Sequence, residues 1–186
     1  MKHAAELVFK NVQIKCDFAA VIRRVHQVIK DIEPHDSVER YTALGVECIT
    51  GRAEIVSPYE VVVDGTKRLT TKNIIVAAGA EPLVPNFPGL SQVPHYTTDN
   101  IWEIKSQPKR LLVLGGGPIG SELAQAFQRL GTQVIQIEKE SQLLIKEDAD
   151  VAHLIHQQFK KEGIDVRTGF TARSFGRDDK GYFVAG

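Results

Sequence analysis

The sequence predicts an α/β chain in which a parallel sheet with helices on its faces follows a segment that contains a small antiparallel β-meander. The second half alternates short apolar runs with amphipathic stretches, which is typical of parallel strands joined by helices. In the first half the apolar period changes from three or four residues to two. A proline-rich stretch separates the halves, so we expect domains at 1–79 and 109–186 with a connector at 80–108.

The composition is that of an ordinary globular chain. Of the 186 residues, 42% are hydrophobic and 25% are charged, and Lys plus Arg equals Asp plus Glu at 23 each. Balanced charge disfavours a nucleic-acid surface, and no run approaches the roughly 20 apolar residues that cross a bilayer. We therefore expect no nucleic-acid partner, no membrane segment in this chain and a cytoplasmic location.

Two cysteines and a histidine pair are the only candidates for thiol or metal chemistry. The separation of Cys16 and Cys48 fits neither a disulfide framework nor a metal site, so we expect each to be a small core residue, with Cys48 in a strand. His153 and His156 are interpreted as part of a solvated helix face. No metal site is predicted.

The first half begins with helices. Apolar residues recur every three or four positions over residues 18–32, with Asp17 as a plausible N-cap and Pro34 beyond the end. A shorter helix is expected at 37–44, ended by Gly45.

Strands with period-two alternation follow the two helices. They are expected at residues 46–49, 52–56, 59–63 and 67–69. Asp64 and Gly65 form a hairpin signal before the last of these strands. The apolar run at 73–77, ended by Gly79, is typical of a buried strand.

The connector and the second half complete the expected elements. A short helix is expected near 99–104, with Trp102 and Tyr96 anchoring the connector to a domain surface. Strands are expected at 111–114, 134–137 and 164–166, and helices at 118–130 and 149–161. The charged residues Arg173, Arg177, Asp178, Asp179 and Lys180 indicate a solvated hairpin.

A glycine-rich motif joins the strand at 111–114 to the following helix. It reads Gly115-Gly116-Gly117-Pro118-Ile119-Gly120, with glycine at the first, third and sixth positions. The first glycine permits a tight turn, the third lets a pyrophosphate approach the backbone, and the sixth lets helix and strand pack closely. The amides and dipole of the helix start attract phosphates. The motif predicts dinucleotide binding, and a glycine-rich turn that binds nothing is the alternative.

The acid at the end of the second strand indicates which dinucleotide binds. Glu138 lies near the spacing expected for a carboxylate that binds the adenosine ribose hydroxyls. The 2′-phosphate of NADP carries about two negative charges, which a carboxylate repels. Lys139 is adjacent but should point to the other face of the strand. We therefore predict NAD rather than NADP as the cofactor.

Three stretches resemble one enzyme family. Residues 111–140, LLVLGGGPIGSELAQAFQRLGTQVIQIEKE, resemble the NAD-binding core of the pyridine nucleotide-disulfide oxidoreductases, which include dihydrolipoyl dehydrogenase, glutathione reductase and mercuric reductase. The stretch IIVAAGAEPLVPNFPGL resembles the family's crossover from its FAD domain to its NAD domain, and GRAEIVSPYEVVVDG resembles its β-meander. The resemblance implies a Rossmann-type NAD-binding domain preceded by a partial FAD-binding domain. The first half is most similar to mercuric-reductase-like members, and Glu138 to NAD-using dihydrolipoyl dehydrogenases.

The resemblance implies roles for matching positions. The NAD-binding positions are Gly115, Gly116, Gly117, Pro118, Ile119, Gly120, Ser121, Glu122, Glu138 and Ala172. Among them, Glu122 would support catalysis near the nicotinamide and the flavin edge, and Ala172 would line the adenine. The FAD-binding positions are Ala53, Ala78, Gly79 and Ala80. The family usually has Thr at the position of Ala78, which puts one supporting hydrogen bond in doubt.

Much of the family's catalytic machinery is absent from the sequence. There is no Cys-x4-Cys pair, no N-terminal glycine-rich FAD turn, no second Gly-Asp FAD motif and no C-terminal dimerisation domain with its catalytic His. We therefore expect an internal fragment that does not turn over alone, from a homodimeric parent that carries FAD and passes hydride from NADH through flavin to a disulfide.

Two other functions stay open from the sequence. One is a non-redox module that binds or senses NAD(H), and the other is a flavoenzyme without the disulfide, such as an NADH oxidase or a ferredoxin reductase. The sequence does not indicate whether mercuric ion, lipoamide or glutathione is the electron acceptor.

Overall fold

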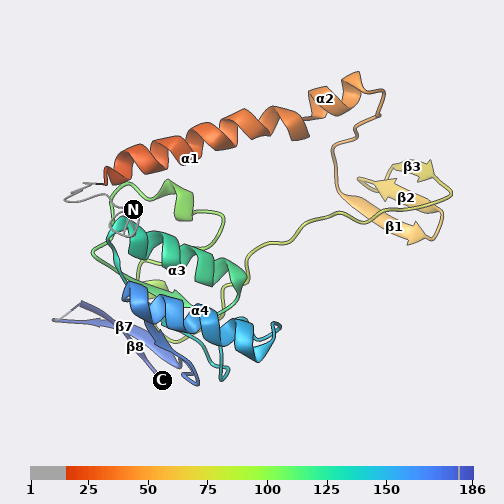
Figure 1. Cartoon of the computed structure of the whole chain (residues 1–186). Helices are drawn as coiled ribbons and strands as arrows, with labels where there is room; N and C mark the ends of the chain where they lie inside the picture. The colour runs from red at the N-terminus through yellow and green to blue at the C-terminus, as the bar shows by residue number, and fades with distance from the viewer. Residues whose placement is uncertain (1–15, 180) are drawn as a thin grey trace. The chain divides into compact units, whose positions relative to one another are not determined.

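The structure is a computed structural model that describes residues 16–179 and 181–186 (Figure 1). The described residues form two compact units, one of residues 16–24 and 84–186 and the other of residues 25–83. Lys180, expected in a solvated hairpin, lies outside the described residues.

The larger unit is built on a parallel three-stranded sheet of order β4-β5-β6. Its strands are Arg110–Leu114 (β4), Gln133–Ile137 (β5) and Asp165–Arg167 (β6). In the register, Leu114 lies beside Ile137, and Ile137 lies beside Arg167. The carboxyl ends of all three strands therefore meet at one edge of the sheet, which is where open α/β sheets bind ligands.

Two helices connect the strands, as the alternating pattern predicts. Helix α3 (Pro118–Leu130) follows β4, and α4 (Ala149–Glu162) follows β5, one residue longer than expected. Gly131 (φ 104°) and Gly163 (φ 86°) end them in the left-handed conformation that favours glycine. The predicted α/β class is confirmed. No helix in the part of the chain that the structure describes is long and apolar enough to cross a membrane.

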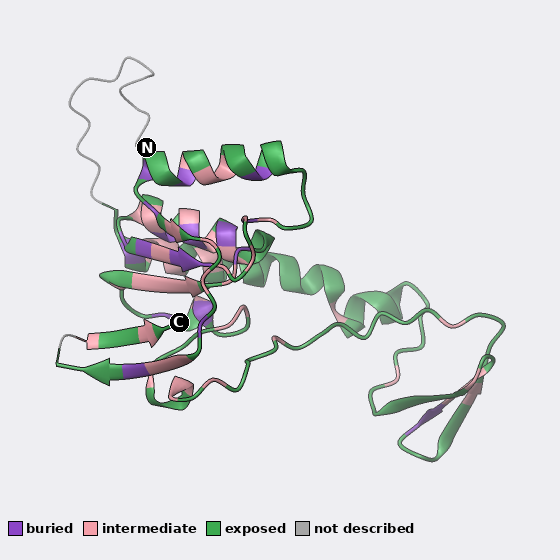
Figure 2. Ribbon diagram, turned by 90° about the horizontal axis from the view of Figure 1, so that it is seen from below, coloured by how far each residue is buried: buried purple, intermediate pink, exposed green. Residues whose placement is uncertain are grey.

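The core of the larger unit lies between the sheet and these helices, where buried residues gather (Figure 2). Its buried side chains include Phe127 of α3, Val134 of β5 and Phe159 of α4. Trp102 packs against this core as predicted, beside Ile101 of the short helix η3 (Ile101–Glu103). Tyr96, the other predicted anchor, is 46% exposed and is not among the residues of this core.

The end of the chain forms a hairpin that packs on the connector. Strands Ser174–Asp178 (β7) and Gly181–Ala185 (β8) pair antiparallel. Phe175 N–H donates to the Pro88 carbonyl at 2.8 Å, and its ring lies 5.5 Å from that of Phe87, just before helix η2 (Leu90–Gln92). The connector is therefore packed against the larger unit from this point on.

The first half of the chain confirms the predicted helices and meander, with α1 beginning in the larger unit and continuing into the smaller one. Helix α1 (Phe18–Ile32) has an N-terminal turn capped by Asp17, whose Oδ1 accepts from Ala20 N–H at 3.1 Å. After η1 (Glu33–Asp36), helix α2 (Val38–Ala43) is capped by Ser37 Oγ. Strands Ala53–Ser57 (β1), Glu60–Val63 (β2) and Lys67–Thr70 (β3) form an antiparallel sheet of order β1-β2-β3.

Two strand predictions are wrong, and so is the prediction that both cysteines lie in a core. Residues 46–49 and 73–77 form no strand, and Ile75 is 91% exposed. An apolar run becomes a strand only when another strand pairs with its backbone, and neither run finds such a neighbour. Cys48 lies in the first of these runs and Cys16 precedes α1, and both thiols are exposed and form no disulfide.

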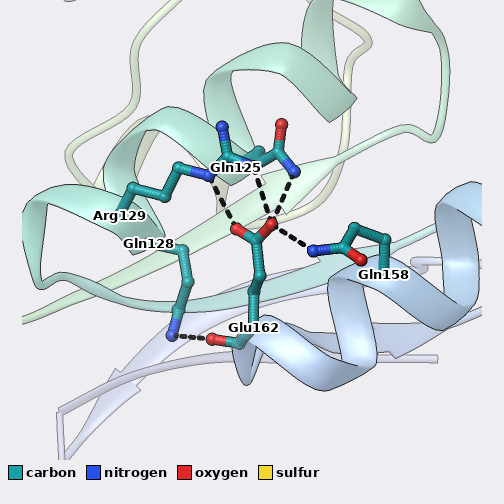
Figure 3. Close-up of polar contacts among 5 residues, drawn as sticks. All are labelled: Gln125, Gln128, Arg129, Gln158 and Glu162. Carbon is teal, nitrogen blue, oxygen red and sulfur yellow. Dashed lines mark hydrogen bonds and ion pairs between the residues drawn. The ribbon is translucent and has the colours of Figure 1, made fainter. Parts of the chain in front are cut away.

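A buried carboxylate holds α3 against α4 (Figure 3). The Glu162 side chain is 4% exposed and accepts two hydrogen bonds from Arg129, at 2.7 and 2.8 Å. The amides of Gln125 and Gln158 donate to it at 3.0 and 2.8 Å, and Gln128 donates to its main-chain carbonyl. The Arg129 guanidinium, helped by Gln158 and Gln125 against the opposing effect of burial, lowers the pKa of Glu162 to about 2.

Replacing Glu162 with glutamine should lower the free energy of unfolding by about 2 kcal/mol at neutral pH, because Arg129 loses a charged acceptor in a partly solvated pair. The pKa of Glu162 is lower in the folded chain than in the unfolded chain. Its contribution is therefore fully present above the unfolded value of 4.5 and is lost as pH falls toward 2. Urea unfolding at several pH values should show the difference between wild type and variant shrinking over that window.

Asp165→Asn is the matched control for this measurement. Asp165 pairs with Arg167 at 2.6 Å in the same unit, but both side chains are about half exposed. Its loss should change the free energy of unfolding by less than about 1 kcal/mol. A Glu162→Gln effect that stayed constant from neutral pH to pH 2 would contradict the assigned role.

Candidate functional site

The glycine-rich turn lies at the carboxyl edge of the parallel sheet, between β4 and α3. Gly115 has φ 110°, a left-handed conformation, and its N–H donates to the Ile137 carbonyl of β5 at 2.8 Å. A Cβ at Gly120 would lie 2.7 Å from the Gly115 carbonyl oxygen and 3.3 Å from Val113 Cγ1. The tight turn and the close helix–strand packing predicted from the glycine spacing are therefore both present.

The middle of the turn is open. Gly117 has φ −71°, and no atom outside its chain neighbours lies within 4 Å of the position that a Cβ would take. It is also the N-cap residue of α3, and no side chain caps the helix. The amides of Ile119 and Gly120 lie in the first helical turn, where no intrahelical carbonyl can accept from them. This space and these donors suit an anionic group such as a pyrophosphate.

A carboxylate lies beside the turn. Glu138 follows the last residue of β5, is half-buried, and accepts from Gly116 N–H through Oε2 at 2.5 Å and from Glu140 N–H through Oε1 at 2.8 Å. Each carboxylate oxygen can accept two hydrogen bonds, so each retains one acceptor position. The carboxylate is thus held in place by two amides and can still receive two hydroxyl donors. Lys139 is exposed and pairs with Glu140 at 3.5 Å.

Two buried polar side chains lie behind the turn. Gln136 of β5 is 0% exposed, and its Nε2 donates to the Gly115 carbonyl at 3.0 Å and to Ser121 Oγ at 3.2 Å. Ser121 Oγ in turn donates to the Gly116 carbonyl at 3.4 Å. The sequence analysis missed Gln136. The available signal was a polar residue inside an apolar strand two positions before Glu138.

The remaining predicted NAD positions lie near this group. Glu122 is exposed in the first part of α3. Ala172 is 6% exposed, so protein atoms already cover most of its side chain. It lies two residues after Phe170, whose N–H donates to the Glu138 carbonyl at 2.9 Å. The structure therefore brings the glycine-rich turn, Ser121 and Glu138 together, and Ala172 lies two residues beyond the main-chain hydrogen bond between Phe170 and Glu138.

The predicted FAD positions form no comparable group. Ala53 begins β1, whereas Ala78, Gly79 and Ala80 lie in a stretch outside any helix or strand, and all four residues are exposed. Gly79 has φ 70°, and nothing surrounds its Cβ position. Within the described smaller unit, no hydrogen bond or strand pairing joins these positions.

The chain is similar to known proteins over nearly its whole length. The pyridine nucleotide-disulphide oxidoreductase family matches residues 6–185. Mercuric reductase of Bacillus cereus is 32% identical over 155 residues, which is 83% of this chain and 24% of that protein. Dihydrolipoyl dehydrogenase of Acholeplasma laidlawii is 30% identical over 160 residues, 84% of this chain and 47% of that protein.

A solved structure shows the same relationship. The HOCl-induced flavoprotein disulfide reductase RclA from Escherichia coli superposes with a TM-score of 0.74 at 26% identity, covering 98% of this chain and 41% of that one. The chain therefore spans less than half the length of each of these three relatives.

Proposed function

The chain belongs to the pyridine nucleotide-disulphide oxidoreductase family, and we propose that its larger unit binds a nicotinamide dinucleotide at the glycine-rich turn, with NAD(H) preferred to NADP(H). One observation carries the proposal: the Glu138 carboxylate is fixed beside the uncapped start of α3, within hydrogen-bonding distance of the turn. Binding sites for phosphate and for ribose therefore lie next to each other.

The pyrophosphate fits the open side of the turn. Because Gly117 has no side chain, the space beside it is free for the pyrophosphate, whereas a larger residue at this position would fill that space. The first-turn amides of α3 supply donors, and the helix dipole favours negative charge there. When bound, the nicotinamide ring supplies hydride chemistry, and the residues of this chain bind and orient the molecule.

The preference for NAD(H) follows from the carboxylate of Glu138. Its two free acceptor positions suit the two adenosine ribose hydroxyls, which are donors. A 2′-phosphate in the same place would meet a negative charge that Gly116 and Glu140 hold in position. We further propose that Glu122 lies near the nicotinamide and that Ala172 lies near the adenine.

We also propose that the whole protein is an FAD-dependent oxidoreductase that passes electrons from the nicotinamide to a disulfide, metal or thiol acceptor. Family membership and the relatives named mercuric reductase and flavoprotein disulfide reductase support this proposal. Residues 1–79 would then belong to the FAD domain, with contacts at Ala53 and Ala78–Ala80, residues 80–108 to the connector and 109–186 to the NAD domain. A homodimer and a cytoplasmic location complete the proposal.

Separate titrations with NADH, NADPH and FAD test the site. We expect the chain to bind NADH at least about tenfold more tightly than NADPH, which corresponds to about 1.4 kcal/mol. Fluorescence of the reduced nicotinamide measures both affinities directly. Equal affinities for NADH and NADPH would contradict the proposed preference. A chain that does not bind NADH would contradict the proposed site.

A further inference from the structure

Gln136 is an unusual residue for its position. It lies in β5 between Ile135 and Ile137, in the middle of the sheet, and is fully buried. Its Oε1 has no hydrogen-bond partner in the described part of the chain. A buried acceptor without a partner destabilises a fold, so burial alone does not explain a glutamine here. Residues that break a local rule in this way are expected at functional sites.

The donor side of the same carboxamide is fully used, by the Gly115 carbonyl of the turn and by Ser121 Oγ of α3. Nε2 donates to the Gly115 carbonyl at 3.0 Å, on one side of the peptide unit that joins Gly115 to Gly116. The N–H of that same peptide unit, at Gly116, is held by Glu138 at 2.5 Å. In a trans peptide the C=O and the N–H point in opposite directions. Gln136 and Glu138, which lie on one face of the strand because they are two residues apart, therefore clamp this peptide between them.

The next peptide unit is fixed as well. The Gly116 carbonyl accepts from Leu144 N–H at 2.8 Å and from Ser121 Oγ at 3.4 Å, and Gln136 Nε2 donates to that hydroxyl. Holding this carbonyl toward Leu144 and Ser121 turns the N–H of Gly117 to the opposite side. The Cβ position of Gly117 is also open, with no atom beyond its chain neighbours within 4 Å, and we place the pyrophosphate beside this residue.

We propose that Gln136 is a positioning residue of the dinucleotide site: its carboxamide fixes the two peptide units of Gly115–Gly117 so that the amides at the start of α3 face the pyrophosphate. This inference rests on the proposed function and extends it. The ribose carboxylate should depend on Gln136 less than the pyrophosphate does, because Glu138 keeps its second bond, to Glu140 N–H.

The test is the full chain with Gln136→Met, which keeps the length of the side chain and removes its donor. NADH and ADP, which both carry a pyrophosphate, should bind about tenfold more weakly, whereas adenosine affinity should change less than about twofold. Ser121→Ala should act in the same direction with a smaller effect. Gln133→Met, at the exposed start of the same strand, is the matched control and should leave all three affinities unchanged.

Two further measurements separate positioning from general stability. The melting temperature of Gln136→Met should change little, because removal of the unpaired Oε1 offsets the loss of the two Nε2 hydrogen bonds. Amide hydrogen exchange at Gly116 and Gly117 should become faster in the ligand-free variant. Unchanged ADP affinity, or an equal loss of ADP and adenosine affinity with a lower melting temperature, would overturn the inference. Failure of the wild-type chain to bind NADH would instead overturn the proposed function, before any variant is compared.

Discussion

Replacing Glu138 with glutamine should shift the ratio of NADPH to NADH affinity by about a hundredfold in favour of NADPH. The carboxylate is expected to accept from two ribose hydroxyls, and hydrogen bonds to a charged group stabilise by about 1 kcal/mol more than neutral ones. Removing the charge also removes the repulsion of the 2′-phosphate. A tenfold loss of NADH affinity and a tenfold gain for NADPH each correspond to about 1.4 kcal/mol.

The glutamine variant is chosen because it keeps the shape of the side chain. Its single carbonyl oxygen can still accept from Gly116 N–H, so the turn should keep its conformation and the melting temperature should fall by only a few degrees. Fluorescence titration with both dinucleotides gives the ratio.

Glu140→Gln is the control for this experiment, since the Glu140 side chain is also an acid at this edge of the sheet, pairs with exposed Lys139 at 3.5 Å, and can be changed without removing the Glu140 N–H that donates to Glu138. Its ratio should equal that of the wild type. A Glu138→Gln ratio within about twofold of the wild type would mean that the carboxylate does not select the dinucleotide.

The features that the sequence predicted correctly depend on residues close together along the chain. Each strand–helix–strand unit of the larger unit is a local pattern, and the glycines at 131 and 163 end their helices as expected. The roles of Gly115 and Gly120 could also be predicted from their spacing, because the two residues meet within one turn. The Gly115 carbonyl oxygen lies 2.7 Å from the position that a Cβ would take at Gly120. Short-range geometry of this kind is fully specified by the local sequence.

The incorrect predictions concern partners that are distant in the sequence. Apolar composition made residues 46–49 and 73–77 resemble strands, but composition does not supply a neighbour for their backbone. The cysteines were predicted to lie in a core because free cysteine is buried in most proteins. The burial of a particular residue depends on what packs against it, and here both cysteines are exposed. The role of Gln136 was missed for the same reason, since its bond to Gly115 joins residues 21 positions apart.

Gly117→Ser and Gly120→Ala should have opposite effects, although both replace a glycine of one motif by a small residue. Gly117 has an extended backbone (φ −71°, ψ 176°) that any residue adopts, and its Cβ would point into open space. Serine is a preferred N-cap, and its Oγ can accept from the first-turn amides of α3. We therefore expect unchanged or slightly raised stability together with at least a tenfold loss of NADH affinity, because the new hydroxyl occupies the space and the donors of the pyrophosphate.

At Gly120 the methyl group of alanine meets backbone rather than space. The 2.7 Å approach to the Gly115 carbonyl oxygen cannot be relieved by a side-chain rotation, and Val113 lies 3.3 Å away. Such overpacking costs about 1–3 kcal/mol, which lowers the melting temperature of a chain of this size by roughly 2–12 °C. Thermal melts and NADH titrations of both variants measure the contrast. If Gly117→Ser instead lost stability and kept NADH affinity, the open side of the turn would be a packing feature of the helix start and the ligand would have to bind elsewhere.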